Sequence, residues 1–210
     1  EHHIDPVLLP IAACAGLSPN QRCSFYKFIC TTFNYSIHLG GPGDIHPALY
    51  KEDIVFAEKC VLIRDLYEIE FAQFYYHFSC GKIFGFCRGL QICNVAFGGS
   101  LTQEIRPSTS EPNRHRETKH LIRFLKKGAT LFDRLFHCAK NILVNSYHHQ
   151  AVKIFNPQIF TVAAVDSDGT IEALEFRNGR GLLFQFHPEI DEDEPWHRLF
   201  FSMAINKSTR

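Results

Sequence analysis

The junction between residues 82 and 99 places the strongest constraint on what this chain can fold into. Lys82 to Phe86 (KIFGF) reads as a short buried strand, and the next residues, CRGLQICNVAF, have a helical pattern that ends at Gly98-Gly99. The sequence GFCRG spans the point where strand becomes helix. Glycines on both sides of its cysteine allow a tight, strained turn, because neither adds a Cβ atom. The pattern predicts a nucleophile elbow, a turn that pushes the Cys87 side chain out of the sheet edge.

A thiol at the start of a helix has the chemistry of a nucleophile. The unpaired N–H groups of the first helical turn and the helix macrodipole favour its thiolate form. The backbone N–H of Arg88 follows the cysteine, and a second N–H from the glycine turn at Gly41 could complete an oxyanion hole. The alternative is structural: Cys87 could be one more small buried apolar residue. A glycine-flanked cysteine alone does not decide between the two.

The segment FQFHPE, residues 184–189, supplies the other groups that a cysteine nucleophile needs. Side chains two residues apart in an extended segment project to the same side, so Glu189 can support one nitrogen of His187 while the other faces the thiol. Pro188 between them restrains His187 to extended backbone geometry. A single histidine near a strand end is otherwise more often an exposed or core residue. With Cys87, these residues make a complete set for acyl transfer: nucleophile, base and orienting carboxylate.

A third polar segment, VNSYHHQAV at residues 144–152, follows a predicted strand. Its polar side chains could line a pocket or belong to an ordinary hydrogen-bonded loop; they are Ser146, Tyr147, His148, His149 and Gln150. Adjacent histidines in an extended chain point in opposite directions, which disfavours a shared metal ion. The twelve histidines show no HExxH or C2H2 spacing and the eight cysteines no CxxC pair, so no metal site is expected.

Short apolar runs alternate with amphipathic stretches along the chain, a rhythm typical of an α/β layer fold. In the first half, Pro6–Pro10 and Phe33–Leu39 read as strands and Arg64–Phe78 as a helix. The second half reads as strands with little helix between them, at residues 118–125, 141–145, 159–165, 169–176 and 181–186. Successive strands of this kind predict an antiparallel or mixed extension of the sheet.

Composition narrows the class of protein. Lys plus Arg and Asp plus Glu both number 22, so no net charge favours nucleic acid or an anionic membrane surface, and a small ligand is the expected partner. No stretch reaches the about 18 apolar residues of a membrane helix, and the first residues do not read as a signal peptide. Eight cysteines spread through apolar segments favour reduced thiols, and therefore a cytoplasmic protein, over a disulfide framework.

Four segments carry a resemblance to a known family. LGGPGDIHPALY, GFCRGLQICNVAFGGSL, VNSYHHQAV and FQFHPE, in this order, resemble the class I glutamine amidotransferase-like hydrolases, and specifically their γ-glutamyl-γ-aminobutyrate hydrolase branch. The resemblance runs from about Pro6 to Glu189. An arginine after the cysteine, where synthetase-linked glutaminases usually carry leucine, points to the stand-alone hydrolase branch.

The resemblance implies a flavodoxin-like three-layer α/β sandwich, with a mixed, mostly parallel central sheet and an antiparallel extension in the C-terminal half. Residues 1–210 are expected to form a single domain of this type that lacks the family's first strand and helix. The resemblance also implies that Cys87, His187 and Glu189 form a catalytic triad that needs no metal or organic cofactor. The sequence does not decide whether the protein forms a homodimer. The helix at residues 64–78 could belong to the core or to an interface.

The resemblance further assigns residues to the substrate. Gly41 and the Arg88 amide would form the oxyanion hole, and Gln91 with the Tyr147-His148 segment would hold the α-amino and carboxylate groups of a glutamyl moiety. The implied oxyanion and substrate-binding residues are Gly41, Gly43, Arg88, Gln91, Ser146, Tyr147 and His148.

The function expected on these grounds is hydrolysis of the γ-glutamyl amide bond of a small compound through a thioester on Cys87. Two alternatives stay open: a glutaminase subunit that delivers ammonia to a synthetase partner, and an inactive homologue that only binds the ligand. The amine half of the substrate is not specified by these motifs.

Overall fold

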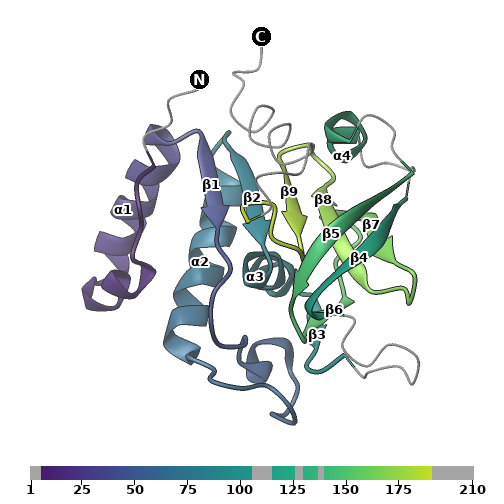
Figure 1. The fold of residues 1–210 in the computed structure, drawn as a ribbon. Coiled ribbons are helices and arrows are strands. Elements are labelled where there is room, and N and C mark those ends of the chain that lie inside the picture. Colours follow the sequence, from purple (N-terminus) through teal and green to yellow (C-terminus); the bar gives the residue numbers. More distant parts are fainter. Residues whose placement is uncertain (1–5, 106–114, 126–129, 137–139, 191–210) are drawn as a thin grey trace.

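The computed structural model of this chain describes residues 6–105, 115–125, 130–136 and 140–190, and Figure 1 shows their arrangement. Its α-helices are α1 (Pro19–Thr32), α2 (Leu62–Phe78), α3 (Arg88–Ala96) and α4 (Thr130–Leu135), with short 3-10 helices at Ile11–Gly16 and Pro47–Tyr50. Its strands are β1 (Tyr35–His38), β2 (Lys82–Phe86), β3 (Ser100–Thr102), β4 (Arg116–Phe124), β5 (Asn141–Tyr147), β6 (Ala151–Ile154), β7 (Phe160–Asp166), β8 (Ile171–Phe176) and β9 (Gly181–Phe184).

The strands form one mixed sheet in the order β1-β2-β9-β8-β7-β4-β5, with β6 pairing to β3 and β8. Within the described residues, parallel pairing is confined to β1 with β2 and β2 with β9. The expectation of a mostly parallel sheet is therefore wrong, whereas the antiparallel extension is confirmed. The reason is the short turns of the C-terminal half: Gly169 and Gly179 take positive φ angles of 90° and 70° and close tight connections that only antiparallel strands can use.

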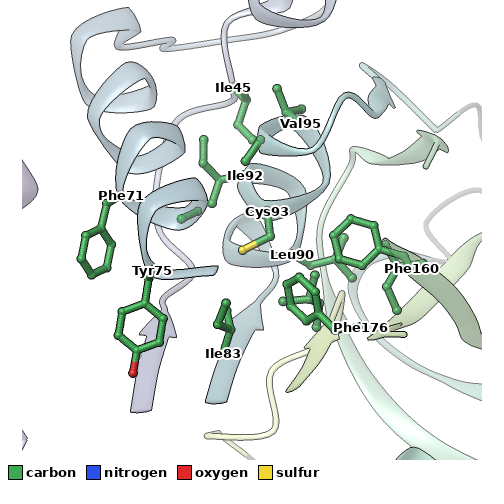
Figure 2. Packing of buried hydrophobic residues seen from close by; sticks show 14 of the residues in the cluster. Ile45, Phe71, Tyr75, Ile83, Leu90, Ile92, Cys93, Val95, Phe160 and Phe176 are labelled. Atoms are coloured by element: carbon green, nitrogen blue, oxygen red, sulfur yellow. The ribbon is translucent and has the colours of Figure 1, made fainter. Parts of the chain in front are cut away.

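Two apolar clusters lie on the two faces of the sheet, because successive strand residues point to opposite sides. Ile83 of β2 packs with α2 and α3 in the larger cluster, where Figure 2 shows Leu90 and Cys93 of α3 beside Phe160 and Phe176. On the opposite face, β2 and β9 pack against aromatic side chains of α4 and β4. Every residue of α3 is buried, so the helix that follows the cysteine is anchored along its whole length. The α/β class is thus confirmed, and the flavodoxin-like three-layer arrangement stays a prediction.

Most elements expected from the sequence are present, and one expected strand is not. The strand expected at Pro6–Pro10 does not form: these residues have no regular structure, and the Pro10 carbonyl accepts a hydrogen bond from the Ala13 amide to start a 3-10 turn. The helix α1 was not expected, although Ser18 and Gln21 form a capping box at its start that is readable in the sequence SPNQ.

Two further observations concern the chain as a whole. None of the helices in the described residues is long and apolar enough to cross a membrane. The cysteines that the structure describes, which are all but Cys138, are free thiols.

Candidate active site

The turn between β2 and α3 holds Cys87 in a strained backbone conformation. Its φ and ψ are 50° and −107°, a region that residues other than glycine avoid at a cost of about 1–3 kcal/mol. Hydrogen bonds fix the turn: the Cys87 amide donates to the Phe184 carbonyl of β9 at 2.7 Å, and the Leu90 amide donates to the Cys87 carbonyl at 3.0 Å. The side chain is neither fully buried nor fully exposed. This is the geometry of the nucleophile elbow that the sequence predicts.

The flanking glycines are required by close contacts on either side of the turn. A Cβ atom on Gly89 would lie 1.9 Å from the His38 carbonyl oxygen of β1, and one on Gly85 would lie 2.8 Å from the backbone of Gly89. Any side chain at these positions would push α3 away from β1 and β2. The helix therefore begins directly above the carboxyl ends of the two parallel strands, where Arg88 as first helical residue has an N–H without an intrahelical acceptor.

His187 and Glu189 form the second part of the site, three to five residues beyond the end of β9. The Nδ1 atom of His187 lies 2.7 Å from a carboxylate oxygen of Glu189. Burial disfavours the charged ring, but interactions with the side chains of Cys87 and Glu189 outweigh it and raise the pKa of His187 to about 10. The ring thus lies between a sulfur and a carboxylate, both of which favour its protonated form.

Asn145 of β5, which the sequence did not single out, holds the backbone of His187. Its side-chain amide donates to the His187 carbonyl at 2.7 Å, and its carbonyl oxygen accepts from the His187 amide at 2.8 Å. Because one buried side chain holds both the N–H and the C=O of His187, the backbone from which the ring projects is fixed in place. The Tyr147 ring, two residues along the same strand, packs edge-on to the imidazole with 6.0 Å between centroids.

Gly40 is a second residue that the sequence did not single out. It lies two residues after the end of β1, where a Cβ atom would be 2.8 Å from Cε1 of His187 and 3.6 Å from Cβ of Cys87. The imidazole and the cysteine thus meet over a backbone position that only glycine leaves open. Its place directly before Gly41 in the turn at 39–43 was the signal that could have identified it.

Substituting Gly40 by alanine is expected to lower kcat about 100-fold, because a shift of the His187 ring by about 1 Å misaligns proton transfer. The added methyl would stand 2.8 Å from Cε1, so the ring must move. Steady-state kinetics on an amide substrate that the wild type turns over measures the effect. Gly16→Ala is the matched control, since a Cβ there meets nothing within 4 Å. Wild-type kcat in the Gly40→Ala variant would show that ring position does not limit the reaction.

The Arg88 side chain points away from the thiol into a buried ion-pair network. Its guanidinium contacts the carboxylates of Asp65 and Glu68 on α2, and its Nε donates to the Gly43 carbonyl at 3.0 Å. Asp65 is fully buried and also accepts a hydrogen bond from the His46 amide at 2.9 Å. The arginine therefore ties α2, α3 and the glycine turn together. The sequence predicted a role for the Arg88 backbone and gave no sign of these two partners.

The glycine turn at 41–43 has the backbone freedom that its position requires. Gly41 and Gly43 have φ angles of 150° and 81°, and a Cβ on Gly43 would meet the Lys59 carbonyl oxygen at 2.6 Å. Asp44, next in the chain, lies 3.0 Å from Nε2 of His149, which joins this turn to the segment after β5. The turn at 41–43 and the start of α3 are thus held together by Arg88, and the oxyanion role of Gly41 stays a prediction.

The remaining predicted residues are placed differently from one another. Gln91 is buried and donates to the Gln185 side chain at 3.3 Å and the Gln150 carbonyl at 3.4 Å. Ser146 is fully buried, whereas Tyr147 is half exposed beside His187. The side chain of His148 turns away from the imidazole of His187 toward the interior, where it approaches Glu172. Their part in substrate binding therefore stays a prediction, and for His148 only its backbone could serve.

A strained cysteine at a strand-to-helix turn, next to an imidazole and its carboxylate, has the groups that a thiol-dependent hydrolase or transferase would need. The comparisons with known proteins give the family. The family model "Peptidase C26" matches residues 11–189. The chain therefore belongs to the Peptidase C26 family.

The individual relatives carry names that state different activities. The chain is 33% identical over 179 residues to the Lactococcus lactis protein "Putative glutamine amidotransferase-like protein YvdE", covering 81% of this chain and 72% of that one. It is 35% identical over 126 residues to the γ-glutamyl-γ-aminobutyrate hydrolase PuuD of Escherichia coli, covering 53% and 47%. Among solved structures, the Thermoplasma acidophilum "putative gmp synthase subunit a protein" shares the fold, with a TM-score of 0.61, 17% identity, and coverage of 87% of this chain and 76% of that one.

Proposed function

We propose that this protein hydrolyses the γ-glutamyl amide bond of a small compound through a thioester on Cys87. The observation that carries the proposal is the strained elbow, which holds the sulfur beside His187 while Glu189 holds the other side of that ring. Membership of the Peptidase C26 family and the similarity to PuuD support the same chemistry.

In the first half-reaction, the thiolate of Cys87 attacks the side-chain carbonyl of the glutamyl group. The negative charge that develops on the carbonyl oxygen faces the Arg88 N–H at the start of α3 and, by the prediction above, the Gly41 N–H. His187, charged because its pKa is raised to about 10, donates its proton to the departing amine. The C–N bond breaks and the glutamyl group stays on sulfur as a thioester.

In the second half-reaction, His187 is neutral and accepts a proton from water, which attacks the thioester. The thiolate leaves, glutamate is released, and the imidazolium is restored. Glu189 keeps Nδ1 protonated throughout, so that the other ring nitrogen faces the sulfur and the water. Asn145 fixes the backbone of His187, so the ring need not reorient between the two steps.

A release assay over a panel of γ-glutamyl amides tests the proposal. The panel contains glutamine, γ-glutamyl-γ-aminobutyrate, γ-glutamyl polyamines and a folate-type γ-glutamate, and glutamate release is measured for the chain alone. Turnover of γ-glutamyl amines well above that of glutamine is the expected result. Release of ammonia from glutamine only after a synthetase is added would instead favour the glutaminase role, which the name of the Lactococcus lactis relative suggests.

The pH dependence of the reaction is expected to show an alkaline limb near pH 10. His187 is the proton donor to the leaving amine, and it is charged only below its raised pKa of about 10, so kcat/KM falls as the pH rises through that value. Glu189→Gln removes a carboxylate that raises this pKa, so the limb should move down by roughly 1–3 pH units. Profiles of kcat/KM for both proteins provide the measurement.

A carboxylate outside the site is the control for this pH experiment. Glu52→Gln removes a charge that pairs with Lys153 on the surface, so its profile should match the wild type. An unchanged alkaline limb in Glu189→Gln would mean that this carboxylate does not act on the ring that transfers the proton.

A further inference from the structure

A second cluster of polar side chains lies inside the antiparallel half of the sheet, apart from the thiol. His115 precedes β4, His148 follows β5, and Glu172 lies on β8, and all three side chains are at most 5% exposed. One donor atom from each lies within 4.8 Å of the other two. His120 of β4 is next to them, with Nε2 3.3 Å from the same Glu172 oxygen that faces the two other rings. The hydrolase mechanism uses none of these side chains.

The hydrogen bonds around the cluster decide which ring nitrogens carry protons. Nδ1 of His148 lies 3.0 Å from the Gln150 carbonyl, which can only accept, so Nδ1 is the protonated nitrogen. Nε2 of His115 lies 3.0 Å from a carboxylate oxygen of Asp168, which likewise assigns the proton to Nε2. In the neutral rings, Nε2 of His148 and Nδ1 of His115 are then lone-pair donors. Both are directed at Glu172.

With both rings neutral, the facing atoms of His115, His148 and Glu172 are therefore all electron-pair donors. Nδ1 of His115 and Nε2 of His148 are each 3.6 Å from Oε1 of Glu172, beyond the about 2.7–3.2 Å of a hydrogen bond. Neither of these two nitrogens, nor either oxygen of Glu172, has a hydrogen-bond partner within the described structure. His120, with Nε2 3.3 Å from Oε1, is the nearest ring that could share a proton with this carboxylate. A buried carboxylate with so little compensation is costly unless a cation lies beside it.

Ligands of one tetrahedral ion explain these separations. Donor atoms about 2.0–2.2 Å from Zn²⁺ lie roughly 3.3–3.6 Å apart, and both histidine nitrogens lie 3.6 Å from Oε1 of Glu172. Asp168 and the Gln150 carbonyl are the outer partners that zinc-binding histidines use to fix their tautomer. We propose that His115, His148 and Glu172 bind a divalent transition-metal ion, Zn²⁺ by the chemistry of the donor set, with His120 beside the Glu172 carboxylate.

The position of this site would let a bound ion hold three segments of the sheet together. It joins the start of β4 and the segment after β5 to β8, and the Gln150 carbonyl that orients His148 also accepts from Gln91 of α3. The β5 strand that ends at the site carries Asn145, which holds His187. A bound ion would thus stiffen the strand that positions the imidazole, without touching the reacting atoms.

Zinc binding by the purified full chain tests the proposal, independently of any hydrolase activity. The protein is stripped with a chelator and titrated with Zn²⁺ against a chromophoric competitor, and with Co²⁺ to record its absorption spectrum. Asp168 is on an exposed turn, so Asp168→Asn should fold normally and bind zinc about 10–100-fold more weakly. Glu172→Gln should lose more affinity than that. His77→Gln, on the exposed end of α2, is the matched control and should bind as the wild type does.

The expected result is one zinc per wild-type chain, a rise in Tm on loading, and a tetrahedral Co²⁺ spectrum without sulfur charge-transfer bands. Absence of zinc binding in the wild type, or wild-type affinity in Asp168→Asn, would overturn the proposal, and the cluster would then be a histidine–carboxylate hydrogen-bond network. Sulfur bands in the Co²⁺ spectrum would also overturn it, because they would place the ion on the free cysteines.

Discussion

Replacement of Cys87 by alanine is expected to lower turnover of γ-glutamyl amides by about 10⁴-fold or more, with little change in the free energy of unfolding. The proposed reaction has no other nucleophile at the elbow, so its covalent step is lost entirely. The side chain is only partly buried, and alanine keeps the Cβ atom and the same strained φ of 50°. Kinetics and urea unfolding of both proteins provide the two measurements.

The other cysteines provide the controls for this variant. Cys80→Ala removes an exposed thiol at the opposite end of β2 from the elbow turn and should leave turnover unchanged. Cys93 of α3 is fully buried, and burial raises the pKa of its thiol, so it cannot substitute for Cys87. Activity within tenfold of the wild type in Cys87→Ala would remove the cysteine from the mechanism.

Cys87→Gly should be inactive but more stable than the wild type in urea unfolding, because glycine accepts the positive φ without strain.

Replacement of Arg88 by methionine is expected to destabilise the fold by about 3–5 kcal/mol, because it leaves the buried carboxylate of Asp65 without its counter-charge. Burial already raises the pKa of Asp65, and loss of the guanidinium raises it further. A folded-state pKa above the unfolded value makes stability fall as the pH rises, so the deficit should be smaller near pH 4 than at pH 7. Urea unfolding at both values measures it.

A surface ion pair is the comparison for this experiment. Lys153→Met breaks the ion pair with Glu52. The Lys153 side chain is 50% exposed and that of Glu52 29%, so the change should alter the free energy of unfolding by less than about 1 kcal/mol. An Arg88→Met variant as stable as Lys153→Met would show that the network on α2 contributes nothing to the fold. Activity should also fall in Arg88→Met, since its Nε positions the Gly43 carbonyl of the glycine turn.

Features that depend on neighbouring residues could be read from the sequence. The elbow follows from glycines on either side of a cysteine at the end of an apolar run, and the structure gives Lys82–Phe86 as a strand and Arg88–Ala96 as a helix. The pairing of His187 with Glu189 follows from alternation in extended chain, and their atoms lie 2.7 Å apart. The same alternation predicts that His148 and His149 diverge, and they do: one faces Glu172 and the other Asp44.

Features that depend on distant segments could not be read in this way. Asn145 meets His187 across 42 residues, and Arg88 meets Asp65 across 23. No spacing rule connects such partners, because the sheet order that brings them together is not local. The histidine cluster has the same character, since His115, His148 and Glu172 come from three separate segments and form no zinc motif. The mostly parallel sheet is what the family resemblance implies, whereas the turn signals at residues 166–169 indicate the antiparallel pairing that β7 and β8 have.

Labelling with a diazo-ketone analogue of glutamine tests the central claim most directly. The reagent presents a glutamyl group with an electrophilic carbon to the thiolate, and peptide mass spectrometry locates the adduct. The account predicts one adduct per chain on Cys87, loss of hydrolysis in proportion to labelling, and protection by a saturating γ-glutamyl amide. Labels spread over the exposed cysteines, or a fully labelled Cys87 in a protein that still hydrolyses its substrate, would contradict it.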